Sequence, residues 1–542
     1  MADGPVHAKM SKLFRGNVGL FRSRTGKPGR LGGPPEGGAV PEPVAPFNAA
    51  MIVPQASPVS GLAQDRTMLF LRNVGAASIA SIAKILIQFA LLPIMALLLG
   101  PKEFGIYALA IPVVVFLTVI ADGGIGLSLA RDRTDAPEIW STAFWLLIAS
   151  GLAISAIVVA CGLLLAKASS EPQLVTIMLI LAASFPFLSL SVLPIARLNR
   201  QGNLVACALA DLVATVVGAA CAIGLGLLHF GAKSLAVQYL ASSIVRAIIL
   251  SLHAFERPKA VFRPFAMLDH LSSGGILMGS RVADLACRSS ESLLFGNAFG
   301  PTSLGAYNLA TQIPRFLFEA FGNPCWAALF AHGLSEQRGR LLQIYYKVSR
   351  FIAFITFPTA AVLAAAGPEL MAHSLGPTWR QAGTFVQILA PGYALGATAS
   401  IGTALLLAFN ANVVFFLITV LLAVGRVIAV GSGFYLNAWQ SVMLVTVFHV
   451  IYSVVVWLSV KDIVGAELSE LLRGMAVSFC ASVLAGAACW GILLVGETSI
   501  GTLCGAIVVA AALFIAVMML IDGNSIKNDL LFLKGFPAAM FR

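Results

Sequence analysis

The stretch LGPKEFGIY (residues 99–107) returns 200 residues later, without a gap, as FGPTSLGAY (residues 299–307). Each copy follows an apolar run long enough to cross a bilayer, and the chain between the copies predicts six crossings. Since an even number of crossings preserves orientation, we predict two parallel repeats related by an axis normal to the membrane. A single motif of this kind is an ordinary interfacial turn, but its recurrence in register indicates a duplication.

The run before the second copy carries a stripe of charge. Arg281, Asp284, Arg288 and Glu291 are spaced three, four and three residues apart and therefore share one helical face. Each unpaired charge at a bilayer centre costs roughly 2.5–3.5 kcal/mol. The stripe therefore either neutralises itself through pairs along its own helix or lines a polar cavity. In the first repeat, Lys84 occupies the position of Asp284.

The composition predicts the fold class. Of the 542 residues 58% are hydrophobic and 11% charged, which is far from a soluble protein. We predict an all-α membrane protein with about 14 transmembrane helices: two parallel six-helix bundles around a central cavity, plus two C-terminal helices. The expected parts are a disordered basic tail, the two bundles, the added helix pair and a final tail, at residues 1–65, 66–256, 266–461, 470–522 and 523–542.

The basic residues of the loops gather on one predicted side of the membrane. The opposite side has only Lys102, Lys167, Lys233 and Arg380. By the positive-inside rule the basic side is cytoplasmic, and both termini fall on it. The formal net charge of +11 is thereby explained without a nucleic-acid partner. The N-terminal tail lacks the apolar core of a signal peptide.

Catalytic and metal-binding patterns are absent from the sequence. The eight cysteines lie in apolar runs without CxxC spacing, and the seven histidines are scattered. No Ser-His-Asp arrangement and no phosphate-binding loop context occurs. We therefore expect a transporter that is not an enzyme and that uses no metal or other cofactor.

Three motifs resemble those of a known family. They are residues 99–109, then Ala121-Asp122-Gly123-Gly124-Ile125-Gly126 with Arg131, and LGPTWRQA at 375–382. Together they resemble the polysaccharide transporter family, the Wzx-type flippases of the multidrug/oligosaccharidyl-lipid/polysaccharide exporter superfamily. The likeness extends over roughly residues 66–460; the long N-terminal tail departs from it.

This resemblance implies a function and a location. The family flips an undecaprenyl-diphosphate-linked oligosaccharide from the cytoplasmic to the periplasmic leaflet of the bacterial inner membrane, for exopolysaccharide, capsule or O-antigen synthesis. It also implies membrane lipid as a partner, and a polysaccharide polymerase and export machinery as further partners.

Cationic side chains within the spans are the candidates for the diphosphate, because arginine binds phosphate oxygens bidentately. The candidate substrate-binding residues are Arg281, Arg288, Lys84 and Arg315. Alternatives remain open. Arg315 has Glu319 four residues on, and Arg246 and Arg426 either pair with Asp211 or extend toward the interface.

Carboxylates within the spans are the candidates for coupling to an ion gradient, because they change charge or ligate a cation. The candidates are Asp284, Glu291 and Asp122. Asp122 has an alternative role, since its side chain in Ala-Asp-Gly-Gly is placed to cap a broken helix.

Two other functions fit the sequence less well. An exporter of small cationic compounds, from the same superfamily, requires an acidic cavity, whereas Arg281, Arg288 and Lys84 make this one basic or balanced. A polysaccharide polymerase or ligase requires a sizeable periplasmic loop, and the longest candidate runs only from Gly367 to Gln381.

Overall fold

The computed structural model describes residues 62–540 with short gaps at 123–124, 132–135, 202, 255–257, 260, 264–266, 318–320, 334–337, 410 and 496–498. Within its helices, the side chains of residues 62–78, 82, 122, 127, 130–131, 204, 268–284, 317, 327–328, 331–333 and 522–540 are also outside the description. Residues 1–61 of the predicted N-terminal tail lie outside the described residues, whereas its last four, 62–65, belong to a helix. The regular structure in the described part is helical throughout, as the composition predicts.

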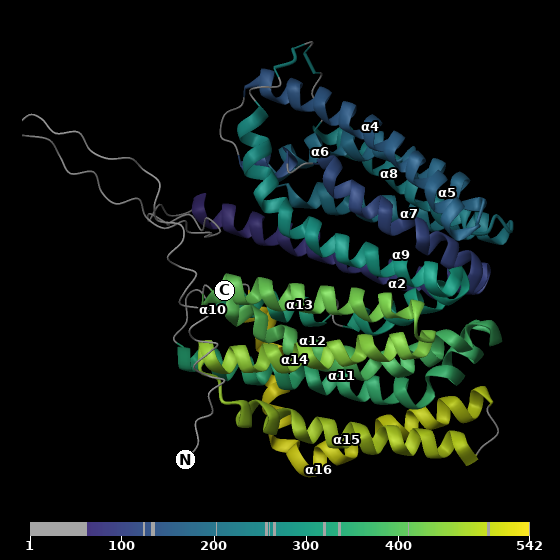
Figure 1. The fold of residues 1–542 in the computed structure, drawn as a ribbon. Coiled ribbons are helices and arrows are strands. Elements are labelled where there is room, and N and C mark those ends of the chain that lie inside the picture. The colour runs from purple at the N-terminus through teal and green to yellow at the C-terminus, as the bar shows by residue number, and fades with distance from the viewer. Residues whose placement is uncertain are drawn as a thin grey trace, which may run out of the picture. The chain divides into compact units, whose positions relative to one another are not determined.

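The helices of the first repeat lie together at one side of the unit formed by residues 61–542 (Figure 1). They are α2 (Leu62–Asp122), α3 (Ile125–Arg131), α4 (Pro137–Ser169), α5 (Gln173–Ala182), α6 (Phe185–Arg200), α7 (Leu204–Leu227) and α8 (Lys233–Ala254). Their sequences are almost continuously apolar, which is what a helix in a bilayer requires.

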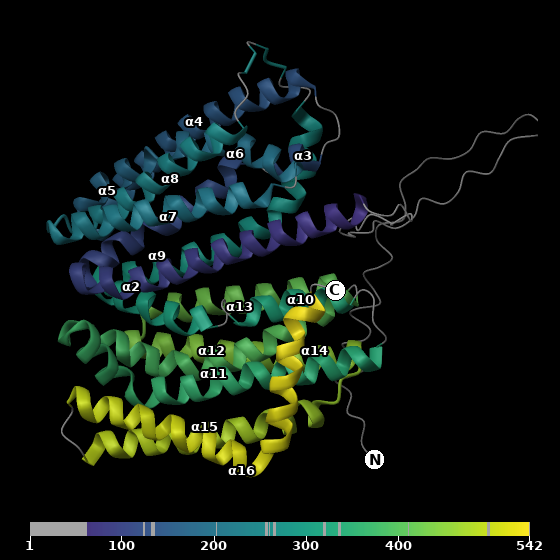
Figure 2. The same ribbon diagram turned by 180° about the vertical axis from the view of Figure 1, so that it is seen from behind.

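The second repeat begins with α9, which packs along α2. Its helices are α9 (Leu268–Leu317), α10 (Asn323–Gly333), α11 (Arg338–Leu375), α12 (Arg380–Ala408), α13 (Asn412–Gly431) and α14 (Ala438–Val464), with 3₁₀ turns at Pro377–Trp379 and Ser432–Phe434. The pair α15 (Leu468–Val495) and α16 (Ile500–Met540) packs against α11 (Figure 2). Helix α16 continues beyond residue 522, where the sequence predicted the last span to end.

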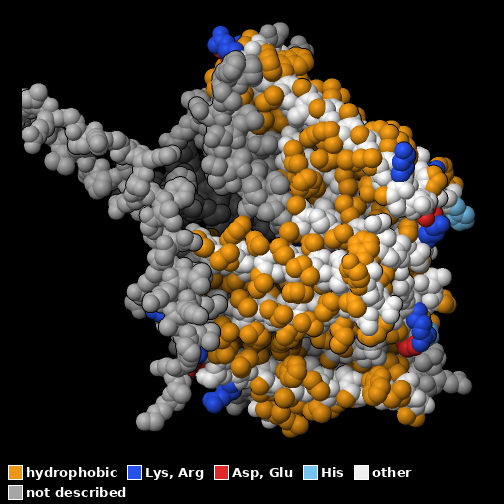
Figure 3. Space-filling model, in the orientation of Figure 1, with side chains coloured by type: hydrophobic (Ala, Val, Ile, Leu, Met, Phe, Trp, Pro, Cys, Tyr) orange, Lys and Arg blue, Asp and Glu red, His pale blue; other side chains and the backbone are white. Residues whose placement is uncertain are grey.

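Eleven segments of the described chain are long and apolar enough to cross a membrane. One of them, Ile79–Ala121, covers most of the two spans that the sequence predicts on either side of the first motif, at 73–99 and 104–130. The all-α membrane class is thereby confirmed, whereas the number fourteen stays a prediction. Apolar side chains cover the surface seen in Figure 3, and the visible charged side chains gather toward its edges.

The repeated motif breaks α2 and α9 in the same way, at Gly100 and at Gly300. We call the part of each helix before the break its first arm and the part after it its second arm. Gly100 has φ 73° and ψ 170°, and Gly300 has φ 79° and ψ 171°. Positive φ is strained for residues with a Cβ, so glycine is the residue that this break requires. Gly376 of the motif before α12 has a similar conformation, with φ 98° and ψ 162°. Three Gly-Pro steps therefore divide helical segments by one backbone device.

The two copies of the motif also contact each other reciprocally. A Cβ built on Gly105 would lie 1.7 Å from the carbonyl oxygen of Pro301, and one built on Gly305 would lie 2.1 Å from that of Pro101. Each glycine thus packs against the proline of the other copy. This is the contact that a two-fold relation between α2 and α9 produces. The first arm of each helix packs against the second arm of the other, as Phe89 on Phe316 and Ser289 on Pro112 show.

The motif before α12 ties the second repeat to the first. The Trp379 side chain is 1% exposed and donates from Nε1 to the carbonyl oxygen of Ala96 in α2, at 3.1 Å. Its ring also packs edge-on against Phe104. A buried indole needs such an acceptor, so this bond fixes the start of α12 beside the break at Gly100.

Candidate functional site

A buried ion pair joins α9 to α13. Glu291 is 4% exposed, and Nη2 of Arg426 donates to its two carboxylate oxygens, to Oε2 at 2.7 Å and to Oε1 at 2.9 Å. Tyr307, on the second arm of α9, donates its hydroxyl to Oε1 of the same carboxylate. A buried charge is tolerated when it is paired and hydrogen-bonded in this manner.

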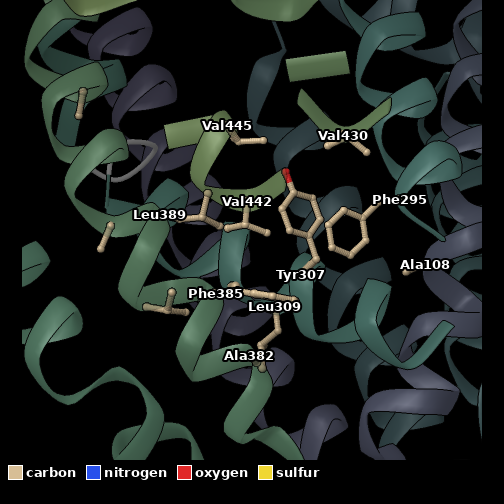
Figure 4. Close-up of a cluster of buried hydrophobic side chains, with 14 of the residues drawn as sticks. Ala108, Phe295, Tyr307, Leu309, Ala382, Phe385, Leu389, Val430, Val442 and Val445 are labelled. Carbon is tan, nitrogen blue, oxygen red and sulfur yellow. The ribbon is translucent and has the colours of Figure 1, made fainter. Parts of the chain in front are cut away.

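Aromatic packing fixes the tyrosine that binds Glu291. The Phe295 ring stacks on the Tyr307 ring with centroids 4.3 Å apart, and Phe385 of α12 packs edge-on against both. In Figure 4 the two stacked rings lie side by side, with the tyrosine hydroxyl directed away from Leu309 and toward the side of Val430 in α13. Tyr307 is the last residue of the repeated motif, so the motif supplies a hydrogen-bond donor to the Glu291 carboxylate on the first arm of α9.

The ion pair lines a pocket of about 300 Å³ between α9, α12, α13 and α14. We call it the arginine pocket, because Arg288, Arg315 and Arg426 line it together with a single carboxylate, Glu291. Arg288 and Arg315 are exposed. The charged groups of the described lining are therefore three guanidinium groups and one carboxylate.

Neutral polar and aromatic groups complete the arginine pocket. Asn308 and Thr311 extend along α9 at one-turn spacing, and Ser292 adds a hydroxyl. The rings of Tyr393 and His449 stack with centroids 4.4 Å apart on the opposite wall. Such a lining can bind an anionic group that is attached to a polar, ring-containing one.

A second charge cluster joins α2 to α7 and α8. Nζ of Lys84 lies 2.9 Å from Oδ2 of Asp211, and Nε of Arg246 lies 2.7 Å from Oδ1. These three side chains are 25–35% exposed. One carboxylate therefore has two cationic partners in the first repeat, and the cluster keeps one positive charge.

The structure brings some of the predicted site residues together and separates others. Arg288, Arg315 and Glu291 line the arginine pocket, whereas Lys84 lies in the cluster of the first repeat. Arg281, Asp284 and Asp122, like the suggested partner Glu319, have side chains outside the described residues. Their predicted roles stay predictions.

The alternative pairings are answered for three residues. Arg246 pairs with Asp211, as one alternative held. The same alternative was wrong for Arg426, which pairs with Glu291 because α13 packs on α9. For Glu291 the ion pair is with another helix, so pairing along α9 does not account for this end of the stripe.

Several lining residues were missed from the sequence. Tyr393 and His449 lie in ordinary apolar runs and carry no signal of their own. Tyr307 closes the repeated motif, and an intramembrane arginine such as Arg426 implies a buried acceptor. Those two signals were available, but they did not identify the partner. Among the described residues, no group of three or more His, Cys, Asp or Glu is placed to hold a metal ion.

Comparison with known proteins identifies relatives over the same region. A family model described as "Polysaccharide biosynthesis protein" matches residues 94–384. The succinoglycan biosynthesis transport protein ExoT of Rhizobium meliloti (strain 1021) is 27% identical over 330 residues, which are 59% of this chain and 65% of that protein. The lipopolysaccharide biosynthesis protein WzxC of Escherichia coli (strain K12) is 20% identical over 58% of this chain and 64% of that protein. The matches thus span just under two thirds of each relative.

Solved structures share the fold at low sequence identity. A lipid II flippase, MurJ, in an inward closed conformation superimposes with a TM-score of 0.69 at 13% identity, covering 83% of this chain and 99% of that one. An inward-facing multidrug resistance transporter of the MATE family gives a TM-score of 0.56 at 15% identity, covering 71% and 95%. At these identities the likeness establishes the fold alone.

Proposed function

The chain belongs to the polysaccharide biosynthesis protein family, and from that membership we propose that it flips an undecaprenyl-diphosphate-linked oligosaccharide across the bacterial inner membrane. The relatives named as transport and biosynthesis proteins of succinoglycan and lipopolysaccharide support a saccharide cargo. The product would supply exopolysaccharide, capsule or O-antigen synthesis, so a polysaccharide polymerase and export machinery are the proposed partners. The protein acts in this scheme as a transporter and not as an enzyme.

The observation that carries this proposal is the arginine pocket. Arg288 and Arg315 face a space of about 300 Å³ at bilayer depth, beside an arginine already neutralised by Glu291. A lipid-linked saccharide carries two negative charges on its diphosphate, and arginine forks bind phosphate oxygens in pairs. Three arginines against one carboxylate in the described lining favour an anionic cargo over the small cationic compounds of a multidrug exporter.

Glu291 is the proposed coupling carboxylate in the described part of the chain. Its ties to Arg426 of α13 and Tyr307 of α9 mean that a change in its charge would loosen two helices at once. Asp284 and Asp122 stay candidates for the same role. A substrate phosphate bound at Arg288 would compete with the Glu291 carboxylate for the arginines of the pocket. Substrate binding would thereby be linked to the positions of α9 and α13.

The test of the site uses single substitutions in cells whose own copy of the gene is deleted. We expect Arg288→Ala and Arg315→Ala to abolish surface polysaccharide at unchanged protein level in the membrane. Arg288→Lys keeps the charge but loses the fork, so it should reduce export without abolishing it. Arg380→Ala is the matched control, since Arg380 pairs with Glu369 away from the pocket. Full output from both alanine variants would contradict the assignment.

The proposed orientation places both termini in the cytoplasm and the turn between α11 and α12 in the periplasm. A cysteine replacing the exposed Ser374 should then react with a membrane-impermeant thiol reagent in intact cells. One replacing Gly339, where a side chain has open space, should react only after lysis. The unsubstituted protein sets the background from its own cysteines, and the reverse pattern would refute the orientation.

A further inference from the structure

A second pocket, of about 330 Å³, lies where the two repeats meet. It is bounded by both arms of α2, by the start of α8 and by the second arm of α9. Its polar groups are the amides of Gln88, Gln238 and Gln312, the Tyr107 hydroxyl and the Arg315 guanidinium. We call it the glutamine pocket. The diphosphate site described above does not use the three amides.

The amides of the three glutamines are without a hydrogen-bond partner in the described part of the chain. Gln88 lies twelve residues before Gly100, and Gln312 lies twelve residues after Gly300. At the rise of a helix this is about 18 Å from each break, which is near the middle of the hydrocarbon core. Unpaired amides at that depth need water or a ligand as partner.

The chemistry of the glutamine pocket fits a carbohydrate. Each amide offers donors and an acceptor, and each sugar hydroxyl is also donor and acceptor, so three amides match a ring of hydroxyls. The stacked rings of Phe89 and Phe316, with centroids 3.7 Å apart, form an apolar wall that suits the C–H face of a sugar. No carboxylate is among the lining residues, so the pocket has no negative charge to pair with a cationic ligand.

Arg315 connects this pocket to the arginine pocket, because it lines both. Gln312 and Thr311 both lie about one helical turn before Arg315. Gln312 lines the glutamine pocket, whereas Thr311 lines the arginine pocket. A ligand with a diphosphate on one side of Arg315 and sugars on the other would fill the two spaces in sequence.

We propose that the glutamine pocket binds the sugar residues next to the diphosphate of the lipid-linked substrate. The inference rests on the proposed function and deepens it. The arginine pocket holds the part that all such lipids share, and Gln88, Gln238 and Gln312 read the part that differs among them. These glutamines are therefore specificity residues of the transporter.

The test is a competition between two lipids of the same membrane. The purified full chain is mixed with a lipid extract of the source organism, supplemented with undecaprenyl diphosphate, and the retained adducts are weighed by native mass spectrometry. We expect the unaltered protein to retain saccharide-bearing lipid in preference to bare undecaprenyl diphosphate. Gln88→Leu/Gln312→Leu should lower that preference roughly tenfold, as the loss of two neutral hydrogen bonds predicts, while binding of the bare lipid persists.

Two further variants complete the experiment. Gln387→Leu removes an amide from α12 that lies in neither pocket, and it should leave the preference unchanged. Gln312→Asn keeps the amide on a shorter side chain. It should therefore lower the preference for saccharide-bearing lipid with little change in side-chain volume. An unchanged preference in both glutamine-pocket variants would overturn the sugar site alone. Retention of neither lipid by the unaltered protein would overturn the proposed function itself.

Discussion

The two repeats place their intramembrane charges in opposite ways. In the first repeat the carboxylate, Asp211, is on α7 and two cations converge on it from α2 and α8. In the second the carboxylate, Glu291, is on α9 and one cation reaches it from α13, with Tyr307 as the second donor. The side chains of the first cluster are 25–35% exposed, whereas the Glu291 and Arg426 side chains are 6% and 19% exposed.

The first arrangement is redundant, because its carboxylate has two cationic partners. The second is strict, because its described carboxylate depends on a single cation. Asp211 keeps a partner if either Lys84 or Arg246 is lost, and all three side chains are partly exposed. Among the described residues Glu291 has one charged partner, and both side chains are largely buried, so the loss of either member leaves an uncompensated buried charge. The second repeat therefore combines the more fragile ion pair with the pocket that contains two further arginines. The following predictions test this contrast.

The largest effect is expected at the strict pair. Glu291→Gln should lower the free energy of unfolding by about 3–5 kcal/mol, because Arg426 stays charged and buried. The counterpart Asp211→Asn should cost about 1 kcal/mol, since its partners are part-exposed. Thermal unfolding in detergent measures both. The double variant Glu291→Leu/Arg426→Met should regain most of the loss, and equal losses in the two repeats would break the contrast.

The tyrosines that close the repeated motif give a matched pair of smaller effects. Tyr307→Phe removes a hydrogen bond to a charged carboxylate, which should cost about 1.5–3 kcal/mol. Tyr107 has the same place in the first motif but makes no hydrogen bond to a described residue, so Tyr107→Phe should change stability by less than about 0.5 kcal/mol. Thermal unfolding of the two variants under the same conditions measures this difference. A larger loss of stability for Tyr107→Phe would contradict the prediction.

Where the repeats are alike, their variants should agree. Gly105→Ala and Gly305→Ala each push a methyl group into a proline carbonyl of the other copy, and the obstacle is backbone that cannot rotate away. Both should cost about 1–3 kcal/mol, and by similar amounts. Gly339→Ala, where a Cβ meets nothing, serves as the control. A marked inequality between the two motif variants would show that the reciprocal contact is not equivalent from its two sides.

The smallest effect is expected at Lys84. Lys84→Met leaves Asp211 paired with Arg246 at 2.7 Å, so stability should fall by less than about 1 kcal/mol. Surface polysaccharide in a deletion strain carrying this variant reports separately on transport. Lost export at normal stability would support the substrate role predicted for Lys84, whereas a large loss of stability would show that the first cluster is as strict as the second.

The repeat made the core of the fold predictable. Identical Gly-Pro steps demand the same backbone, and Gly100 and Gly300 adopt φ values within a few degrees of each other. The apolar runs likewise predict helices, because a bilayer permits few alternatives. These features depend on local chemistry, which the sequence contains in full.

The pairing of charges was less predictable, because it depends on which helices pack together. The spacing of Arg288 and Glu291 allows a bond along α9, but Arg426 approaches from α13, 135 residues away in the chain. The spacing of charges within one helix carries no information about that approach. Pocket residues such as Tyr393 and Asn308 were missed for the same reason, since nothing local distinguishes them from core.

The reciprocal contact between Gly105 and Pro301, and between Gly305 and Pro101, also has a meaning for the history of the chain. A half-length ancestor that associated with a second copy of itself would make this contact twice, as every self-complementary dimer does. In such an ancestor one codon change would alter both sides of the interface together. Fusion of the two halves frees each side to change separately. The corresponding residues Lys84 and Asp284 have diverged to opposite charge, whereas positions 105 and 305 are both still glycine.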